Sequence, residues 1–273
     1  MIIDTHPHFG DPSRPIPALY RTESPEVYKA VVVPEGVTGA VFMETQSSGV
    51  EEVEWVLSLA AEDPFFVGLV GDIRPSDDNF AEHIDRFAEN PVFSGIRVHG
   101  KELESDQSLN RFIEKAERLV AHDLELDVHL GYEGFDKMFE IARRLPELRL
   151  VIDHIGECYP LTKDTPNPRW VEVIQAAADL PQTYCKVSAF VQMTVAEPAP
   201  TDVDFYRATF DVLWDAFGED RLIYASNWPQ IERVSDYPTV QRIVSEYFGG
   251  KGDEALEKFF WKNAKAAYKY VER

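Results

Sequence analysis

Short runs of apolar, largely β-branched residues alternate with longer amphipathic stretches along the whole chain. Continuous apolar runs of this length are typical of strands buried on both faces of a parallel sheet, and the stretches between them have the spacing of covering helices. The runs predict eight strands, at Ile2–Asp4, Gly39–Glu44, Phe66–Asp72, Gly95–His99, Leu124–His129, Leu148–Asp153, Thr183–Ser188 and Leu222–Ser226.

The amphipathic stretches predict helices at Pro25–Val32, Gly49–Ala61, Asp78–Glu89, Asp106–Ala121, Tyr132–Arg144, Pro168–Ala178 and Asp202–Phe217. Two more helices follow the eighth strand, and the last spans Asp253–Val271. Eight strand–helix units predict one (β/α)8 TIM-barrel domain over residues 1–273. A doubly wound open sheet is the alternative, but it would need a glycine-rich first loop where this chain has His6-Pro7-His8.

The composition is that of a soluble globular protein, with 44% hydrophobic and 27% charged residues among 273. A net charge of −21 disfavours nucleic acid and anionic membrane surfaces as partners, so we expect a small-molecule substrate and leave homo-oligomers open. No signal peptide or membrane-spanning run is recognisable, and two cysteines are too few for a disulfide scaffold. The cytoplasm is the expected location.

Five of the seven histidines lie at or just beyond the C-terminal ends of predicted strands, and these are His6, His8, His99, His129 and His154. The active sites of barrel enzymes are built at those strand ends, so the distribution favours an active site over scattered structural histidines. In an extended backbone, residues two apart point to the same side, so His6 and His8 can approach one metal ion. The histidines therefore predict a metal site at the barrel mouth.

Four motifs resemble the amidohydrolase superfamily, namely the opening His6-Pro7-His8, Gly95-Ile96-Arg97, Asp153-His154-x-Gly156 and Asn227-Trp228-Pro229. The resemblance is to the branch of barrel hydrolases with sugar-acid lactonases and the pyrone-dicarboxylate and sulfomuconolactone hydrolases. It extends to the closing Asn263-Ala264 and Tyr268. It implies a barrel whose mouth holds His6 and His8, with His129 and His154 converging on them.

One position departs from the family pattern, because Asn227 stands where relatives carry an aspartate that binds metal or activates water. An amide neither accepts a proton nor supplies a negative charge. Three neutral imidazoles suffice to hold zinc, so we predict His6, His8 and His129 as ligands. His154 is then the predicted catalytic acid/base, and Asn227 is predicted to orient the attacking water. Zinc is the expected ion, with manganese or a metal-free site as alternatives.

Four further residues are predicted to bind substrate: Arg97, His99, Lys186 and Trp228. Arg97 and Lys186 stand at strand ends of an acidic protein, where they could meet a carboxylate or a developing oxyanion. A surface ion pair is the alternative for each of these two cations.

The leading hypothesis is a hydrolase of a small carboxylated or sugar-derived ester, most simply a lactone, attacked by metal-bound water. The resemblance also implies an alternative, the non-oxidative decarboxylation of a small unsaturated acid in the same pocket. The third hypothesis is a binding protein that kept the barrel without turnover, and Asn227 is its motivation.

Overall fold

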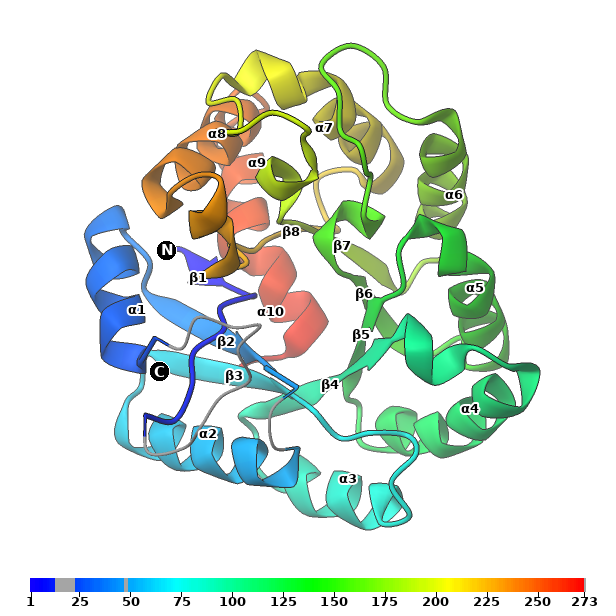
Figure 1. The fold of residues 1–273 in the computed structure, drawn as a ribbon. Coiled ribbons are helices and arrows are strands. Elements are labelled where there is room, and N and C mark those ends of the chain that lie inside the picture. The colour runs from blue at the N-terminus through cyan, green and yellow to red at the C-terminus, as the bar shows by residue number, and fades with distance from the viewer. Residues whose placement is uncertain (13–22, 47–48, 273) are drawn as a thin grey trace.

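The structure is a computed structural model that describes residues 1–12, 23–46 and 49–272. Its eight strands form one parallel sheet in which each strand pairs with the next in sequence order. Figure 1 shows the strands as a ring with the helices around its outside. The strands are β1 (Ile3–Asp4), β2 (Gly39–Met43), β3 (Phe66–Gly71), β4 (Phe93–His99), β5 (Glu125–His129), β6 (Arg149–Ile152), β7 (Thr183–Val187) and β8 (Leu222–Tyr224).

The helices follow the strands around the barrel, so the predicted (β/α)8 TIM barrel is confirmed. They are α1 (Pro25–Val32), α2 (Val50–Glu62), α3 (Phe80–Ala88), α4 (Asp106–Ala121), α5 (Phe135–Arg144), α6 (Pro168–Ala178), α7 (Val203–Phe217), α8 (Tyr237–Gly249), α9 (Asp253–Glu257) and α10 (Asn263–Tyr268). Within the described ranges, no helix is both long enough and apolar enough to span a membrane.

The helix predicted over Asp253–Val271 begins at Asp253 as expected, but its repeat changes in the middle and it ends at Tyr268. A π-helical turn, Lys258–Lys262, separates α9 from α10, and Lys269 ends α10 with a left-handed φ of 50°. A π-turn adds a residue to the helical repeat and so rotates the face that follows it. After the π-turn, α10 packs against β6 and β8 of the barrel, and its residues Ala264 and Tyr268 contact the inner apolar cluster.

Contacts between the first and last strands close the ring. The Thr5 hydroxyl donates to the Tyr224 carbonyl at 2.8 Å, and the Ser226 amide donates to the Asp4 carboxylate at 2.9 Å. Further along, the His8 amide donates to the Trp228 carbonyl at 2.7 Å. Residues that follow β1 and β8 are therefore fixed beside each other at the barrel mouth.

Two apolar clusters stabilise the barrel, one between the strands and the surrounding helices and one inside the ring. The inner cluster joins β-strand residues such as Val41, Val70 and Ile223 to Ala264 and Tyr268 of α10. In the view of Figure 1, α10 appears in line with the middle of the ring. One end of the barrel is thus filled by a helix, which leaves the opposite rim, where the strands end, for a binding site.

Gly95 in β4 allows the close approach of β5, because a Cβ there would lie 2.8 Å from the Glu125 carboxyl carbon and closer still to its backbone oxygen. We expect Gly95→Ala to lower the free energy of unfolding by about 1–3 kcal/mol, as overpacking of a core does. Urea unfolding followed by circular dichroism measures the effect. The matched control is Gly249→Ala, whose Cβ meets nothing within 4 Å, and equal stability of the two variants would contradict the packing argument.

Candidate active site

The chemically active side chains lie where the parallel strands end, because these ends meet at one rim of the barrel. They come from seven of the eight strands or the residues just after them: His6, Glu44, Arg97, His99, Asp127, His129, Asp153, His154, Lys186, Ser188 and Asn227. The five histidines predicted at strand ends are all at this rim, whereas His83 lies in α3 and His122 directly follows α4.

Lys186 is fully buried in the barrel interior, between two carboxylates. Its Nζ donates to Asp127 Oδ1 at 2.5 Å and to Asp153 Oδ1 at 3.0 Å, and it lies 3.2 Å from His6 Nδ1. Burial by itself would lower the pKa of Lys186, but the two aspartates outweigh it and raise the pKa. Burial likewise opposes ionisation of Asp153, yet Lys186 and His6 hold its pKa well below the usual value.

Arg97 forms a second buried ion pair, with Glu44. Its Nε donates to Glu44 Oε1 at 2.6 Å, and its Nη1 lies 3.3 Å from His6 Nε2 and 3.5 Å from Asp153 Oδ2. Burial would raise the pKa of Glu44, but the guanidinium outweighs burial and lowers it. The alternative of surface ion pairs is therefore wrong for both Arg97 and Lys186, since their charges are paired inside the barrel.

A chain of hydrogen bonds links Glu44 to Glu157 through two histidines. His99 Nε2 lies 2.9 Å from Glu44 Oε1, His99 Nδ1 lies 3.1 Å from His129 Nδ1, and His129 Nε2 lies 2.8 Å from Glu157 Oε1. Both ring nitrogens of His129 therefore have hydrogen-bonding partners. The His129 ring lies 5.3 Å from that of His154, so it stays beside the residues with which the sequence predicts it to act.

Ligand atoms of His6, Asp153 and His154 all lie within 4.8 Å of one another. Burial lowers the pKa of both imidazoles well below the usual value, so they are neutral and can coordinate a cation. His154 Nδ1 lies 2.9 Å from the Ser188 hydroxyl, and Asp153 Oδ2 is buried without a hydrogen-bond partner. Two nitrogen donors and one carboxylate fit zinc or a similar divalent ion, and the contacts with Ser188 and Lys186 would orient them.

His8 lies beside this group but outside it. Its ring packs edge-on against His6 with centroids 4.8 Å apart, and its Nδ1 lies 3.0 Å from the Met43 carbonyl oxygen. Burial lowers the pKa of His8 to about 3. The His-x-His motif thus places both imidazoles at the mouth, as the sequence predicts. The other two candidate ligands beside His6 are Asp153 and His154, which directly follow β6.

A pocket of about 500 Å³ opens at the rim, and we call it the central pocket. Its lining combines cationic, carboxylate, imidazole and amide groups with apolar surface: His8, Thr45, Gln46, Arg97, His129, His154, Glu157, Ala189, Gln192, Met193, Asn227, Gln230 and Arg233. The Asn227 amide donates to Gln192 Oε1 at 2.7 Å, so it belongs to this wall. The backbone of Asn227 has a φ of 62°, which asparagine tolerates better than most residues.

Three residues predicted to bind substrate lie outside the lining of the central pocket. Trp228 is buried in the core against Tyr28, with ring centroids 5.2 Å apart, and its indole donates to Glu232. Lys186 lies below the pocket in its ion pairs, and His99 is held by Glu44. Of the four, Arg97 alone is part of the lining.

Sequence reasoning missed Asp127 and the ligand role open to Asp153. Asp127 precedes His129 by two positions in β5, so the two residues share one side of the strand. A charged residue at an inward position of a buried strand was the available signal, because such a charge needs a partner. The partner, Lys186, is 59 residues away and could not be named from spacing.

Comparison with known proteins identifies relatives among sugar lactonases. The chain is 28% identical over 280 residues to a protein named L-fucono-1,5-lactonase from Burkholderia ambifaria, across 97% of this chain and 91% of that protein. It is 25% identical over 166 residues to a protein named L-rhamnono-gamma-lactonase from Scheffersomyces stipitis, across 54% and 48% of the two chains.

A crystal structure of an amidohydrolase from Burkholderia multivorans with bound zinc has the same fold. It superposes with a TM-score of 0.85 at 22% identity and covers 99% of this chain and 100% of that one. The sequence model of the amidohydrolase family matches residues 3–270. The match extends over nearly the whole chain and includes every strand and every rim residue described above, and the protein therefore belongs to the amidohydrolase family.

Proposed function

We propose that this protein is a single-domain hydrolase that opens sugar-derived lactones to their hydroxy acids. The observation that carries the proposal is the group of His6, Asp153 and His154, of which His154 also lines the central pocket beside Arg97 and uncharged amides. The two named relatives quoted above are lactonases, which supports this substrate class over others.

The reaction adds a water oxygen to the lactone carbonyl carbon and breaks the bond from that carbon to the ring oxygen. A divalent ion held by His6, Asp153 and His154 would supply Lewis acidity for this step, and we propose zinc because the donors are nitrogen and oxygen. Ser188 holds His154 through Nδ1, which leaves Nε2 as the nitrogen for the ion.

The chain itself supplies charge and orientation to the substrate. Arg97 carries a fixed positive charge at the pocket wall, held in place by Glu44, and we assign it to the carbonyl oxygen of the lactone. The amides of Asn227 and Gln192 are bonded to each other and suit the hydroxyl groups of a sugar ring. Asn227 thus positions substrate, and no step requires it to take a proton.

The decarboxylase alternative has less support, because the central pocket offers amides for hydroxyl groups and both named relatives above are lactonases. Acid release with L-fucono-1,5-lactone tests the proposal directly, while gas release from unsaturated acids would favour decarboxylation. Absence of both, with retained ligand binding, would favour a non-catalytic protein. Cytoplasmic location and homo-oligomer formation remain predictions.

Protein purified without chelator is expected to hold about one equivalent of divalent metal per chain. We expect His154→Asn to lose that metal and to lower kcat/KM by more than the roughly 10–100-fold that outer partners of a metal contribute. His129→Asn is the matched variant and is expected to keep the metal, because both of its ring nitrogens bond to protein groups. Elemental analysis and lactone hydrolysis measure the two effects.

Metal loss in His129→Asn with retention in His154→Asn would instead support the ligand set His6, His8 and His129 that the sequence predicts. Retained metal with lost turnover in His154→Asn would return His154 to the acid/base role. His122→Asn is the control for a histidine substitution outside the site, since His122 directly follows α4 and pairs with Asp85 of α3.

Asn227→Asp adds a carboxylate to the pocket wall at a backbone conformation that aspartate also tolerates. We expect tighter metal binding and no gain in lactone hydrolysis at neutral pH, since added negative charge weakens the Lewis acidity of the ion. Gln230→Glu introduces the same charge from another wall position and controls for pocket charge alone. Activity that arises with Asp at this position, where the native protein has none, would show that the native chain is not a lactonase.

A further inference from the structure

A second pocket of about 470 Å³ lies beside the central pocket, and we call it the outer pocket. The two pockets share Glu157 and Met193 in their linings. Each lies within the range of about 300–1,000 Å³ that small-molecule sites occupy. A ligand in the outer pocket would therefore be in reach of a group bound where the lactone reacts.

Three rim loops build the outer pocket in a fixed geometry. Gly131 has a φ of 61°, and a Cβ there would lie 2.7 Å from Glu157 Oε2, so the glycine allows the carboxylate to approach. The Leu161 amide donates to the Met193 carbonyl at 2.8 Å, which joins the loops after β6 and β7. Asn167 Nδ2 donates to the Tyr132 hydroxyl at 3.0 Å and fixes that ring. The pocket is preformed by these contacts.

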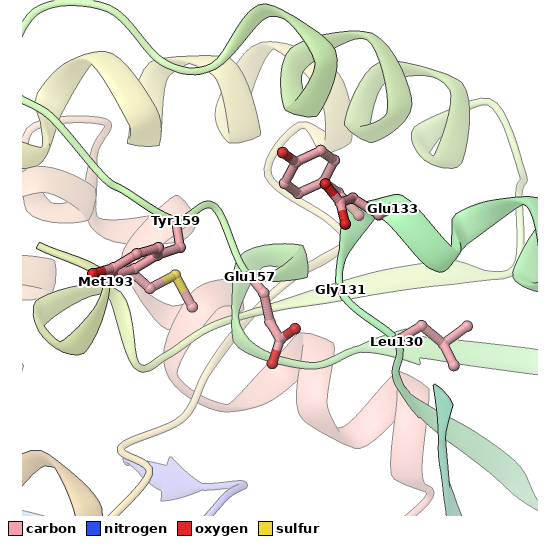
Figure 2. Close-up of a pocket in the computed structure, with 7 residues that line it drawn as sticks. Leu130, Gly131, Glu133, Glu157, Tyr159 and Met193 are labelled. Carbon is pink, nitrogen blue, oxygen red and sulfur yellow. The ribbon is translucent and has the colours of Figure 1, made fainter. Parts of the chain in front are cut away.

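The lining offers flat apolar faces together with hydrogen-bond acceptors. Tyr159 is 59% exposed, and Figure 2 shows it with Met193 on one side of Glu157 and Leu130 on the other. Glu133 contributes a second carboxylate to the lining. Exposed aromatic rings stack on apolar faces, and carboxylates accept hydrogen bonds from hydroxyl groups. A group with both features, an apolar face and several hydroxyls, is a sugar ring.

The charge of the lining decides between neutral and anionic sugars. Two of the lining residues, Glu133 and Glu157, carry carboxyl groups, and carboxyl groups are ionised at neutral pH unless their surroundings oppose it. Among the described residues that line the outer pocket, none is lysine, arginine or histidine. An acidic sugar would meet negative charge without a compensating cation, whereas a neutral sugar would donate its hydroxyls to the carboxylates.

We infer that the outer pocket binds a neutral glycosyl substituent carried by the lactone, so that the enzyme acts on lactones derived from disaccharides. The inference rests on the proposed function, because it places the reacting ring in the central pocket. Hydrolysis adds water across the ring ester alone, and the glycosidic bond to the substituent stays intact. Tyr159 and Glu133 are then specificity-determining residues that do not touch the reacting atoms.

The test compares lactobiono-1,5-lactone, which carries a galactosyl group, with glucono-1,5-lactone, and includes L-fucono-1,5-lactone as a reference. Acid release above the spontaneous rate gives kcat/KM for each. We expect the glycosylated lactone to exceed its unsubstituted counterpart by about tenfold, as a well-placed recognition contact does. Equal or lower kcat/KM for the glycosylated lactone, or turnover of L-fucono-1,5-lactone alone, would overturn the inference while the proposed function stands.

Variants assign the preference to the outer pocket. Tyr159→Ala and Glu133→Gln are expected to remove most of the preference and to leave kcat/KM for glucono-1,5-lactone unchanged, while Tyr159→Phe keeps the ring and the preference. Val27→Ala removes an exposed apolar side chain from α1 and controls for surface truncation. A preference that survives Tyr159→Ala and Glu133→Gln would also overturn the inference. If the protein does not accelerate the hydrolysis of any of the three lactones, both the proposed function and the inference are refuted.

Discussion

The barrel depends on the burial of one ammonium group, that of Lys186, inside a ring of apolar strands. Removing a charge from water costs several kcal/mol, roughly, and the cost is offset only where opposite charges and hydrogen bonds surround it. Asp153 supplies such a charge, Asp127 accepts a second hydrogen bond from Lys186, and the Tyr268 hydroxyl donates to Asp127 at 3.2 Å. Burial raises the pKa of Asp127 to about 7, and the ammonium of Lys186 opposes this rise. Three strands and the terminal helix are thus held in one register by one cation, because displacement of any of them would leave a buried charge unpaired.

This ion cluster also explains how the rim chemistry is positioned. Lys186 and Asp153 fix one side of His6, and Arg97, held by Glu44, approaches its other ring nitrogen. The cations lower the electrostatic cost of the buried carboxylates, and the carboxylates lower that of the cations, so the layer below the pocket is nearly balanced. At the rim, the lining of the central pocket combines the guanidinium groups of Arg97 and Arg233 and the carboxylate of Glu157 with amides, imidazoles and one hydroxyl.

The sequence by itself determined the barrel and the rim that carries the site. Apolar runs of strand length separated by amphipathic stretches admit few arrangements other than parallel strands covered by helices, and each predicted strand overlaps an observed one. Because parallel strands end at the same rim, the positions of His6, His8, His129 and His154 along the chain already placed them together. The exception was the end of the chain, where the π-turn at Lys258–Lys262 has no signature in the helical spacing.

Only the tertiary structure decided which rim residues act together. The order of the strands shows which residues line the same pocket. Metal binding and hydrogen bonding, however, depend on distances of a few ångströms between side-chain atoms, and side-chain rotamers and burial set these distances. The partners of His129 come from other elements, His99 from β4 and Glu157 from the segment after β6, and the partner of Lys186, Asp127, comes from β5. Burial turned Arg97 and Lys186 from candidates for surface pairs into fixed interior charges. These pairings depend on the packing of segments that are distant in sequence, so the spacing of residues along the chain does not reveal them.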